Sequence, residues 1–422
     1  MKLEKKIYFP DFSLLVILLL LSFFLRLVIA YIFGDQNIEN EWKIITYSLI
    51  NDKSYSFYNF NGERLPCVYM PPMYPFFLYF IKIISLEKID FINLIIFSQV
   101  ILSTIAVYFF YKINNKIFNK NLSLINSFIF SFFPLNLYAA GQISSVSFQL
   151  FFSLIFLSYF FSICEKQNLK NIIIFSIVSG ILILTRGEFI LIFILTMFYI
   201  FFIRKINFKN LIKIILIVLL VISPYIIRNY LTFNQIVIVK SLGFNLWKGN
   251  NQYSLIGGTS VSPPVSYDKS WKNFDKPEYQ ELKTKLENIK IDKFYEIRRD
   301  DIFLTEAIKN IKEDYGRYIN LFLEKILSFF FVDFNSEYPN YFNHFYFLPT
   351  LVLSLLSFPG IFLAFKKKDF KFNYLLFYLF LNLFIFSVFF ILPRYKLSII
   401  PIQIMLATYF LNYVYERFFS KK

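Results

Sequence analysis

Histidine, cysteine and charge are all scarce in this chain of 422 residues. The single histidine, His344, excludes a metal site built from imidazoles, and two cysteines, Cys67 and Cys164, exclude a framework of disulfides. Charged residues make up 17% of the chain, whereas soluble globular domains hold about 25%. Because 57% of the residues are hydrophobic, the chain is neither disordered, nor a nucleic-acid binder, nor an ordinary soluble enzyme.

Long apolar runs are what the chain has instead. Many of them reach about 20 residues, the length that crosses a hydrocarbon core of about 30 Å. They predict an all-α polytopic membrane protein with about ten transmembrane helices. The expected spans are residues 12–33, 89–111, 121–140, 146–163, 171–185, 188–203, 211–228, 346–365, 372–392 and 396–414.

The net charge of +16 indicates how the chain is oriented in the membrane, and it does not indicate a polyanionic partner. The excess of basic residues lies in short loops between the expected spans, at 112–120, 204–213 and 366–371. Loops rich in Lys and Arg stay on the cytoplasmic side of a membrane. This pattern predicts that both termini are cytoplasmic, and that the other loops lie outside.

This orientation divides the chain into three parts. Residues 1–228 form an N-terminal transmembrane module that includes an outer loop, 34–70, and a helix lying in the outer interface, 71–85. Counting 71–85 as a span would instead place the lysines of 112–120 outside. Residues 229–345 form a long extracytoplasmic region, and residues 346–422 form the C-terminal transmembrane helices.

Two amphipathic helices are expected within the long outer region, because apolar residues recur there at helical spacing. Their expected buried faces are Tyr279, Leu282, Leu286 and Ile289 in the first, and Leu304, Ile308, Ile311 and Tyr315 in the second.

Three carboxylates, Asp35, Glu39 and Glu41, follow the first expected span. Such a cluster suits a catalytic base that deprotonates an acceptor hydroxyl, or oxygen ligands for a metal ion. It is equally typical of a helix start, with Asp35 as the N-cap and the other acids facing the helix dipole. The residues alone leave both interpretations open.

Cations stand at the outer ends of several later spans, where charge is costly without a function. Arg394 and Lys396 occupy a tight outer loop against the positive-inside trend, and Arg228 ends another span. Because a guanidinium matches phosphate oxygens, these cations are candidate ligands of a phosphate, either of a phospholipid headgroup or of a substrate. Arg186 is a further candidate, although Glu188 beside it offers an ion pair instead.

Candidate contacts for a sugar or an acceptor come from Tyr74, Asn245, Trp247 and Asn250. An indole ring stacks on the apolar face of a sugar while amides bond its hydroxyls. The alternative is an aromatic residue of the membrane interface flanked by turn-forming residues.

The order of these groups resembles that of bacterial membrane glycosyltransferases with the GT-C fold, in the family of dolichyl-phosphate-mannose protein mannosyltransferases and aminoarabinose transferases. The resemblance covers most of the chain. It rests on the blocks GDQNIENEWKIITYSL, PPMYPFFLYF, LTRGEFILIF, PYIIRNYLTF, NLWKGNN, FYEIRRDDIFLTEAIKNI and LPRYKLSIIP. It implies a polyprenyl-phosphate sugar donor used at the outer face of a bacterial inner membrane, and Asp35 as the catalytic base.

One departure from the family pattern concerns metals. The outer turn between the third and fourth expected spans, Gly141–Ser147, holds no carboxylate, whereas relatives often have an acidic residue there. The sequence therefore does not support a divalent cation, and it requires no cofactor.

The residues and the resemblance together predict an enzyme that transfers a hexosyl or pentosyl group from a polyprenyl-phosphate-linked donor to an acceptor hydroxyl, by a single displacement with inversion. The expected partners are the donor, membrane lipids, and an acceptor glycan, lipid or protein. Two alternatives are a lipid or glycolipid transporter or flippase, in which Arg26 and the outer cations line a pathway, and a non-catalytic subunit of an assembly.

Overall fold

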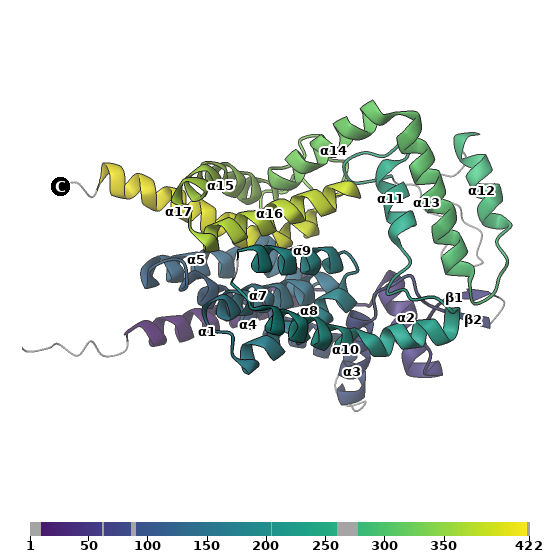
Figure 1. The fold of residues 1–422 in the computed structure, drawn as a ribbon, viewed down its shortest axis with the longest axis horizontal. Coiled ribbons are helices and arrows are strands. Elements are labelled where there is room, and N and C mark those ends of the chain that lie inside the picture. The colour runs from purple at the N-terminus through teal and green to yellow at the C-terminus, as the bar shows by residue number, and fades with distance from the viewer. Residues whose placement is uncertain (1–9, 61–62, 86–89, 204, 260–276, 420–422) are drawn as a thin grey trace, which may run out of the picture.

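The computed structural model describes residues 10–60, 63–85, 90–203, 205–259 and 277–419. The chain ends that we expect in the cytoplasm, 1–9 and 420–422, lie outside these ranges. Most helices run along one direction and form a bundle (Figure 1). The bundle helices are α1 (Pro10–Phe33), α4 (Phe91–Asn114), α5 (Lys120–Phe132), α6 (Pro134–Ala140), α7 (Ser145–Glu165), α8 (Leu169–Thr185), α9 (Phe189–Phe202), α10 (Phe208–Phe233), α15 (Phe347–Lys367), α16 (Phe370–Val388) and α17 (Ile400–Phe418).

Within the described ranges, six helices are long and apolar enough to cross a membrane: α1, α4, α7, α10, α15 and α16. A seventh span results if α5 and α6, bent by 56° where Pro134 begins α6, count as one. The prediction of a helical polytopic membrane protein is confirmed. The count of ten is not confirmed, because α8 and α9 are short and α17 does not meet the same measure.

The remaining elements gather mainly beyond one end of the bundle (Figure 1). They are α2 (Asn40–Asp52), β1 (Ser56–Phe60), β2 (Glu63–Pro66), α3 (Met73–Ser85), α11 (Leu242–Asn250), η1 (Pro277–Tyr279), α12 (Gln280–Glu287), α13 (Tyr295–Glu313), α14 (Tyr315–Phe330) and η2 (Pro393–Ser398). Strands β1 and β2 form an antiparallel hairpin that the sequence analysis did not predict. Figure 1 shows α3 across the direction of the bundle helices, the orientation expected of a helix lying in an interface.

The two amphipathic helices of the outer region differ in outcome. The face predicted for α12 is confirmed, since Leu282 and Leu286 are buried. The face predicted for α13 is wrong, because Ile308 is exposed while Phe303 is fully buried. The buried side of α13 also carries Glu296, Arg299 and Asp300. An apolar pattern cannot reveal a face that buries charged side chains.

Arg26 in α1 is fully buried in the bundle. Its Nε donates to Ser103 Oγ of α4 at 2.9 Å, and its Nη1 donates to the carbonyl of Ser131 in α5 at 3.2 Å. The side chain therefore joins three helices, and it is not among the residues that line the cavity described below.

Membrane orientation gives a direct test. Lys367 and Lys290 are both exposed, and the charge pattern puts them on opposite sides of the membrane. In a variant without Cys67 and Cys164, we expect Lys290→Cys to react with a membrane-impermeant thiol reagent in intact cells and Lys367→Cys to be protected. If only the cysteine at 367 were labelled, the predicted orientation in the membrane would be wrong.

Candidate active site

A large cavity of about 2210 Å³ lies, in the described part of the chain, where the segments predicted to be outside meet. Among the described residues, none from the lysine-rich loops 112–120, 204–213 and 366–371 lines it. The volume exceeds the roughly 300–1,000 Å³ of an ordinary small-molecule pocket, so the cavity has room for two ligands side by side. Its polar walls come from the segments 35–42, 142–146, 185–188, 236–248, 338–346 and 389–395.

Asp35 is fixed on the turn between α6 and α7. Its backbone N–H donates to the carbonyl of Gly141 at 3.0 Å, and its Oδ2 accepts from Ile143 N at 2.7 Å. Glycine at 141 lets this turn lie close to the end of α1, because an added Cβ would lie 3.0 Å from the Cα of Ala30. The N-cap position of α2 belongs to Glu39, so the alternative of Asp35 as an ordinary helix cap is wrong.

The environment of Asp35 favours a proton acceptor. Burial raises the pKa of this half-buried carboxyl, the N–H of Ile143 opposes the rise, and the charge of Glu39 adds to it. Among the contacts of the described residues, none uses Oδ1 of Asp35. One oxygen thus anchors the side chain on the turn, while the other can meet a ligand in the cavity.

The grouping of the carboxylates decides which ligands the chain could offer a metal ion. In the described part of the chain, no three His, Cys, Asp or Glu side chains are grouped to hold a metal ion. The turn at Gly141–Ser147 gives Asp35 backbone groups rather than a second carboxylate. We therefore assign no ligands for a divalent cation.

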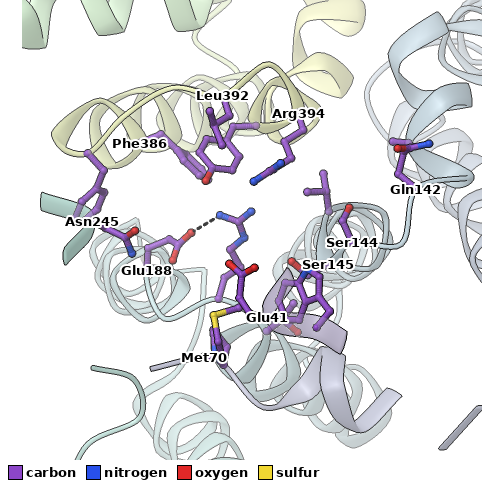
Figure 2. A pocket seen from close by; sticks show the side chains of 18 of the residues that line it. Glu41, Met70, Gln142, Ser144, Ser145, Glu188, Asn245, Phe386, Leu392 and Arg394 are labelled. Atoms are coloured by element: carbon purple, nitrogen blue, oxygen red, sulfur yellow. Dashed lines mark hydrogen bonds and ion pairs between the residues drawn. The ribbon is translucent and has the colours of Figure 1, made fainter. Parts of the chain in front are cut away.

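A second charged group faces the same cavity. Arg186, between α8 and α9, pairs with Glu188 Oε1 at 3.0 Å, and its guanidinium lies 4.8 Å from the ring centre of Tyr395. Arg394 also lies over that ring, at 5.7 Å. Figure 2 shows the side chains of Glu41, Glu188 and Arg394 converging on one space. The predicted Arg186–Glu188 ion pair is therefore present, and it forms part of the cavity wall.

Lys248 of α11 completes this group. Burial lowers the pKa of its ammonium, the positive charge of Arg394 lowers it further, and Glu41 opposes both. The charges of Arg394 and Glu41 thus act on Lys248 across the cavity, although the three residues belong to distant parts of the chain.

Two predicted phosphate ligands lie outside the cavity. Arg228 donates through Nη1 to the carbonyl of Cys67 at 2.7 Å and through Nη2 to that of Tyr55 at 3.1 Å. Lys396 is buried, and its Nζ donates to the carbonyl of Phe331. Because both cations are occupied with backbone carbonyls, the structure removes them from the predicted donor site.

Of the four predicted sugar or acceptor contacts, Asn245 lines the cavity and the other three do not. Tyr74 is buried and donates to Gln99 Oε1 at 2.8 Å. Trp247 is fully buried in the packing of α11 against α13. Asn250 donates to the carbonyl of Val388 at 2.8 Å. These three support the fold instead of meeting a ligand.

Comparison with known proteins supports the resemblance drawn from the sequence. Residues 70–227 match the model of the dolichyl-phosphate-mannose-protein mannosyltransferase family. A search of the curated proteins finds no match. Among solved structures, the oligosaccharyltransferase AglB of Archaeoglobus fulgidus, with an inhibitory peptide and a dolichol-phosphate, aligns with a TM-score of 0.57 and 15% identity. The alignment covers 96% of this chain and 50% of AglB. This chain has the GT-C fold.

Two further structures belong to the same comparison. The Archaeoglobus fulgidus oligosaccharyltransferase tethered to an acceptor peptide aligns with a TM-score of 0.56 and 14% identity, over 96% of this chain and 50% of that enzyme. ArnT from Cupriavidus metallidurans, bound to undecaprenyl phosphate, aligns with a TM-score of 0.42 and 10% identity, over 93% and 77% of the two chains. The GT-C chain described here thus spans about half the length of the oligosaccharyltransferases.

The sequence analysis assigned no role to two cations that line the cavity, Lys248 and Arg299. Both lie in sequence blocks that carry the family resemblance, and this was the one feature of the sequence that could have identified them. The charge pattern alone does not separate Arg299 from Arg298 beside it, which forms a two-fold ion pair with Asp292.

Glu296 joins the hairpin to α13 and gives the GT-C chain a pH-dependent stability. Its Oε2 accepts from the backbone N–H groups of Val68 and Tyr69, and burial raises its pKa to about 7. Since this pKa lies above the ordinary 4.5, the contribution to stability is fully present below about pH 4.5 and is lost as the pH rises through 7.

We expect the Tm of the purified protein to fall between pH 5 and 8, and to fall less in Glu296→Gln. An identical pH dependence in the two proteins would contradict this assignment.

Proposed function

We propose that this chain transfers a hexosyl or pentosyl group from a polyprenyl-phosphate-linked donor to an acceptor hydroxyl at the extracytoplasmic face of a bacterial inner membrane. The observation that carries the proposal is one cavity that brings together the carboxylate of Asp35 and the cations Arg394 and Lys248. The family that matches residues 70–227 and the dolichol-phosphate held by AglB support this class of donor.

Apolar side chains at the membrane end of the cavity suit the lipid part of such a donor. Leu219, Ile222 and Ile226 of α10 line the cavity, as do Ile190 and Leu191 of α9. A polyprenyl chain lying along these helices would be shielded from water by side chains as apolar as itself. Its phosphate would then reach Arg394 and the α8–α9 turn.

The leaving group requires positive charge. When the bond between the anomeric carbon and the phosphate oxygen breaks, the phosphate departs with the electron pair, and fixed cations stabilise its developing charge. Arg394 and Lys248 supply this charge. Arg186 is partly neutralised by Glu188, so we assign it mainly to positioning Tyr395 and, through that ring, Arg394.

The acceptor requires a base on the other side of the sugar. Asp35 takes the hydroxyl proton while the acceptor oxygen forms its bond to the anomeric carbon, opposite the departing phosphate. Attack from that side inverts the anomeric configuration. Glu41 and Asn245, at the second charged group, would contact the sugar or its acceptor, and Glu39 would act on Asp35 through its charge.

The test is sugar transfer by the purified protein in lipid. A panel of polyprenyl-phosphate hexoses and pentoses is offered with short glycan, lipid and peptide acceptors, and the anomeric configuration of the product is determined by NMR. We expect transfer with inversion. Retention would exclude the single displacement, and no transfer from any donor would contradict the function.

The contacts of Arg26 within the bundle give no support to a transport pathway through that residue.

A further inference from the structure

Arg299 is a buried cation in the cavity wall. The residue is 5% exposed, lies on α13, and is among those that line the cavity. Aromatic rings surround its guanidinium, and attraction between a cation and ring faces holds it in place. The ring centres lie at 5.6 Å for Tyr58, 5.8 Å for Tyr69, 5.0 Å for Phe244 and 5.2 Å for Phe303.

The donors of this guanidinium lack an acceptor within the described part of the chain. Arginine carries five N–H donors, yet no hydrogen bond or ion pair joins Arg299 to another described residue. Glu296, one turn earlier, uses Oε2 to accept from the backbone of the hairpin, and its charge acts on Arg299 without a hydrogen bond between the two side chains. Arg298, by contrast, is half exposed and pairs with Asp292 through two bonds of 2.9 Å.

A buried charged donor without an acceptor is unfavourable, and an anionic ligand would remove that cost. The rings fix the position of the Arg299 side chain, and none of them accepts a hydrogen bond from it. The arrangement is therefore preorganised for a planar or tetrahedral anion, which a guanidinium binds through paired hydrogen bonds.

The place of Arg299 separates it from the phosphate of the donor lipid. Helix α13 stands with α11 and the hairpin beyond the end of the bundle (Figure 1). Arg394 and Arg186 lie instead in short segments that join bundle helices: η2, between α16 and α17, and the turn between α8 and α9. Lys248 of α11 belongs with that group, because the charge of Arg394 acts on its ammonium, whereas the groups that act on the charge of Arg299 are Tyr58, Tyr69, Tyr295 and Glu296. A phosphate attached to a membrane-bound chain is expected beside Arg394, so Arg299 meets another group of the substrate.

We propose that Arg299 forms a second anion-binding position in the cavity, which recognises a carboxylate or phosphate substituent on a sugar of the donor or the acceptor. This inference rests on the proposed function, because it names the chemistry of a substrate of the same cavity. Asn245 lines the same cavity and would bond hydroxyls of that sugar. The enzyme would thus prefer acidic sugars over neutral ones.

Binding is tested first, without any transfer. Glucuronate, glucose and inorganic phosphate are titrated by calorimetry against the full chain in phosphatidylcholine nanodiscs. We expect the wild type to bind glucuronate about tenfold or more tightly than glucose, and Arg299→Met to lose this preference. Arg298→Met, the neighbouring control, and Arg394→Ala should both retain it.

Arg299→Lys covers the case in which Arg299→Met does not fold. It keeps the charge between the rings but loses the paired donors, so the preference should fall several-fold with an unchanged Tm. Equal affinity of the wild type for glucuronate and glucose, or a preference unchanged in the variant that folds, would overturn the proposal.

Transfer assays then identify the source of the anion. One arm pairs an acidic donor sugar with a neutral acceptor, and the other pairs a neutral donor with an acidic acceptor. The arm in which Arg299→Met raises KM shows which substrate carries the group. Absence of transfer in both arms with the wild type would contradict the proposed function, whereas the glucuronate titration would still decide on Arg299.

Discussion

Replacing Asp35 with Asn should lower kcat by about 10²-fold or more and leave the fold intact. The amide oxygen of Asn can still accept the N–H of Ile143, so the side chain stays on the turn between α6 and α7. The amide cannot take a proton from the acceptor hydroxyl. The measurement is turnover of a polyprenyl-phosphate sugar by the purified variant in lipid, with the Tm as the check on folding.

Asp90→Asn is the matched control. Asp90 is the N-cap of α4 and accepts from Asn93 N at 2.9 Å, and Asn caps a helix about as well as Asp. This variant should keep full activity. Unchanged turnover in Asp35→Asn would move the base to Glu39 or Glu41, and unchanged turnover in all three single variants would end the proposed mechanism.

The pH profile gives a second readout for Asp35. A general base must be ionised, so kcat/KM falls as the pH drops through its pKa. Because burial and Glu39 raise the pKa of Asp35, this fall should occur at a higher pH than for an ordinary aspartate. Glu39→Gln removes one of the two causes and should shift the fall to lower pH.

The fold was largely predictable because membrane helices leave a strong one-dimensional signal. Each expected apolar span coincides largely with a bundle helix, and the break at Pro134 follows from a missing N–H. The hairpin and the buried face of α13 were not predictable in this way. Glu296 is buried by contacts with Val68 and Tyr69, more than 200 residues earlier in the chain, and no local pattern encodes such a contact.

The site was predictable only in part, for a related reason. Asp35 and Arg394 lie in the cavity as expected, whereas Arg228 and Lys396 bond backbone carbonyls. Sequence places all of these residues near one membrane face, but the direction of each side chain depends on tertiary packing. The same packing turns Lys248 into the cavity, although the Trp beside it is buried.

Replacing Arg394 with Ala should lower kcat/KM for the donor by about 10²–10³-fold, because one preorganised cation at the developing phosphate charge is removed. Arg394→Lys should recover part of this loss, since it keeps the charge but not the paired donors of a guanidinium. The measurement is steady-state transfer with the donor varied, and Arg417→Ala, an exposed arginine near the C-terminus, is the control.

The pKa of Lys248 distinguishes a direct electrostatic role of Arg394 from a structural role. The charge of Arg394 lowers the pKa of Lys248, so its removal should raise that pKa. Lys248 stabilises the phosphate only while protonated, so activity is lost as the pH rises through its pKa. In Arg394→Ala the alkaline fall in kcat should therefore move to higher pH, whereas in Arg417→Ala it should not move. An Arg394→Ala enzyme with normal kcat/KM and an unmoved alkaline limb would remove this arginine from the donor site.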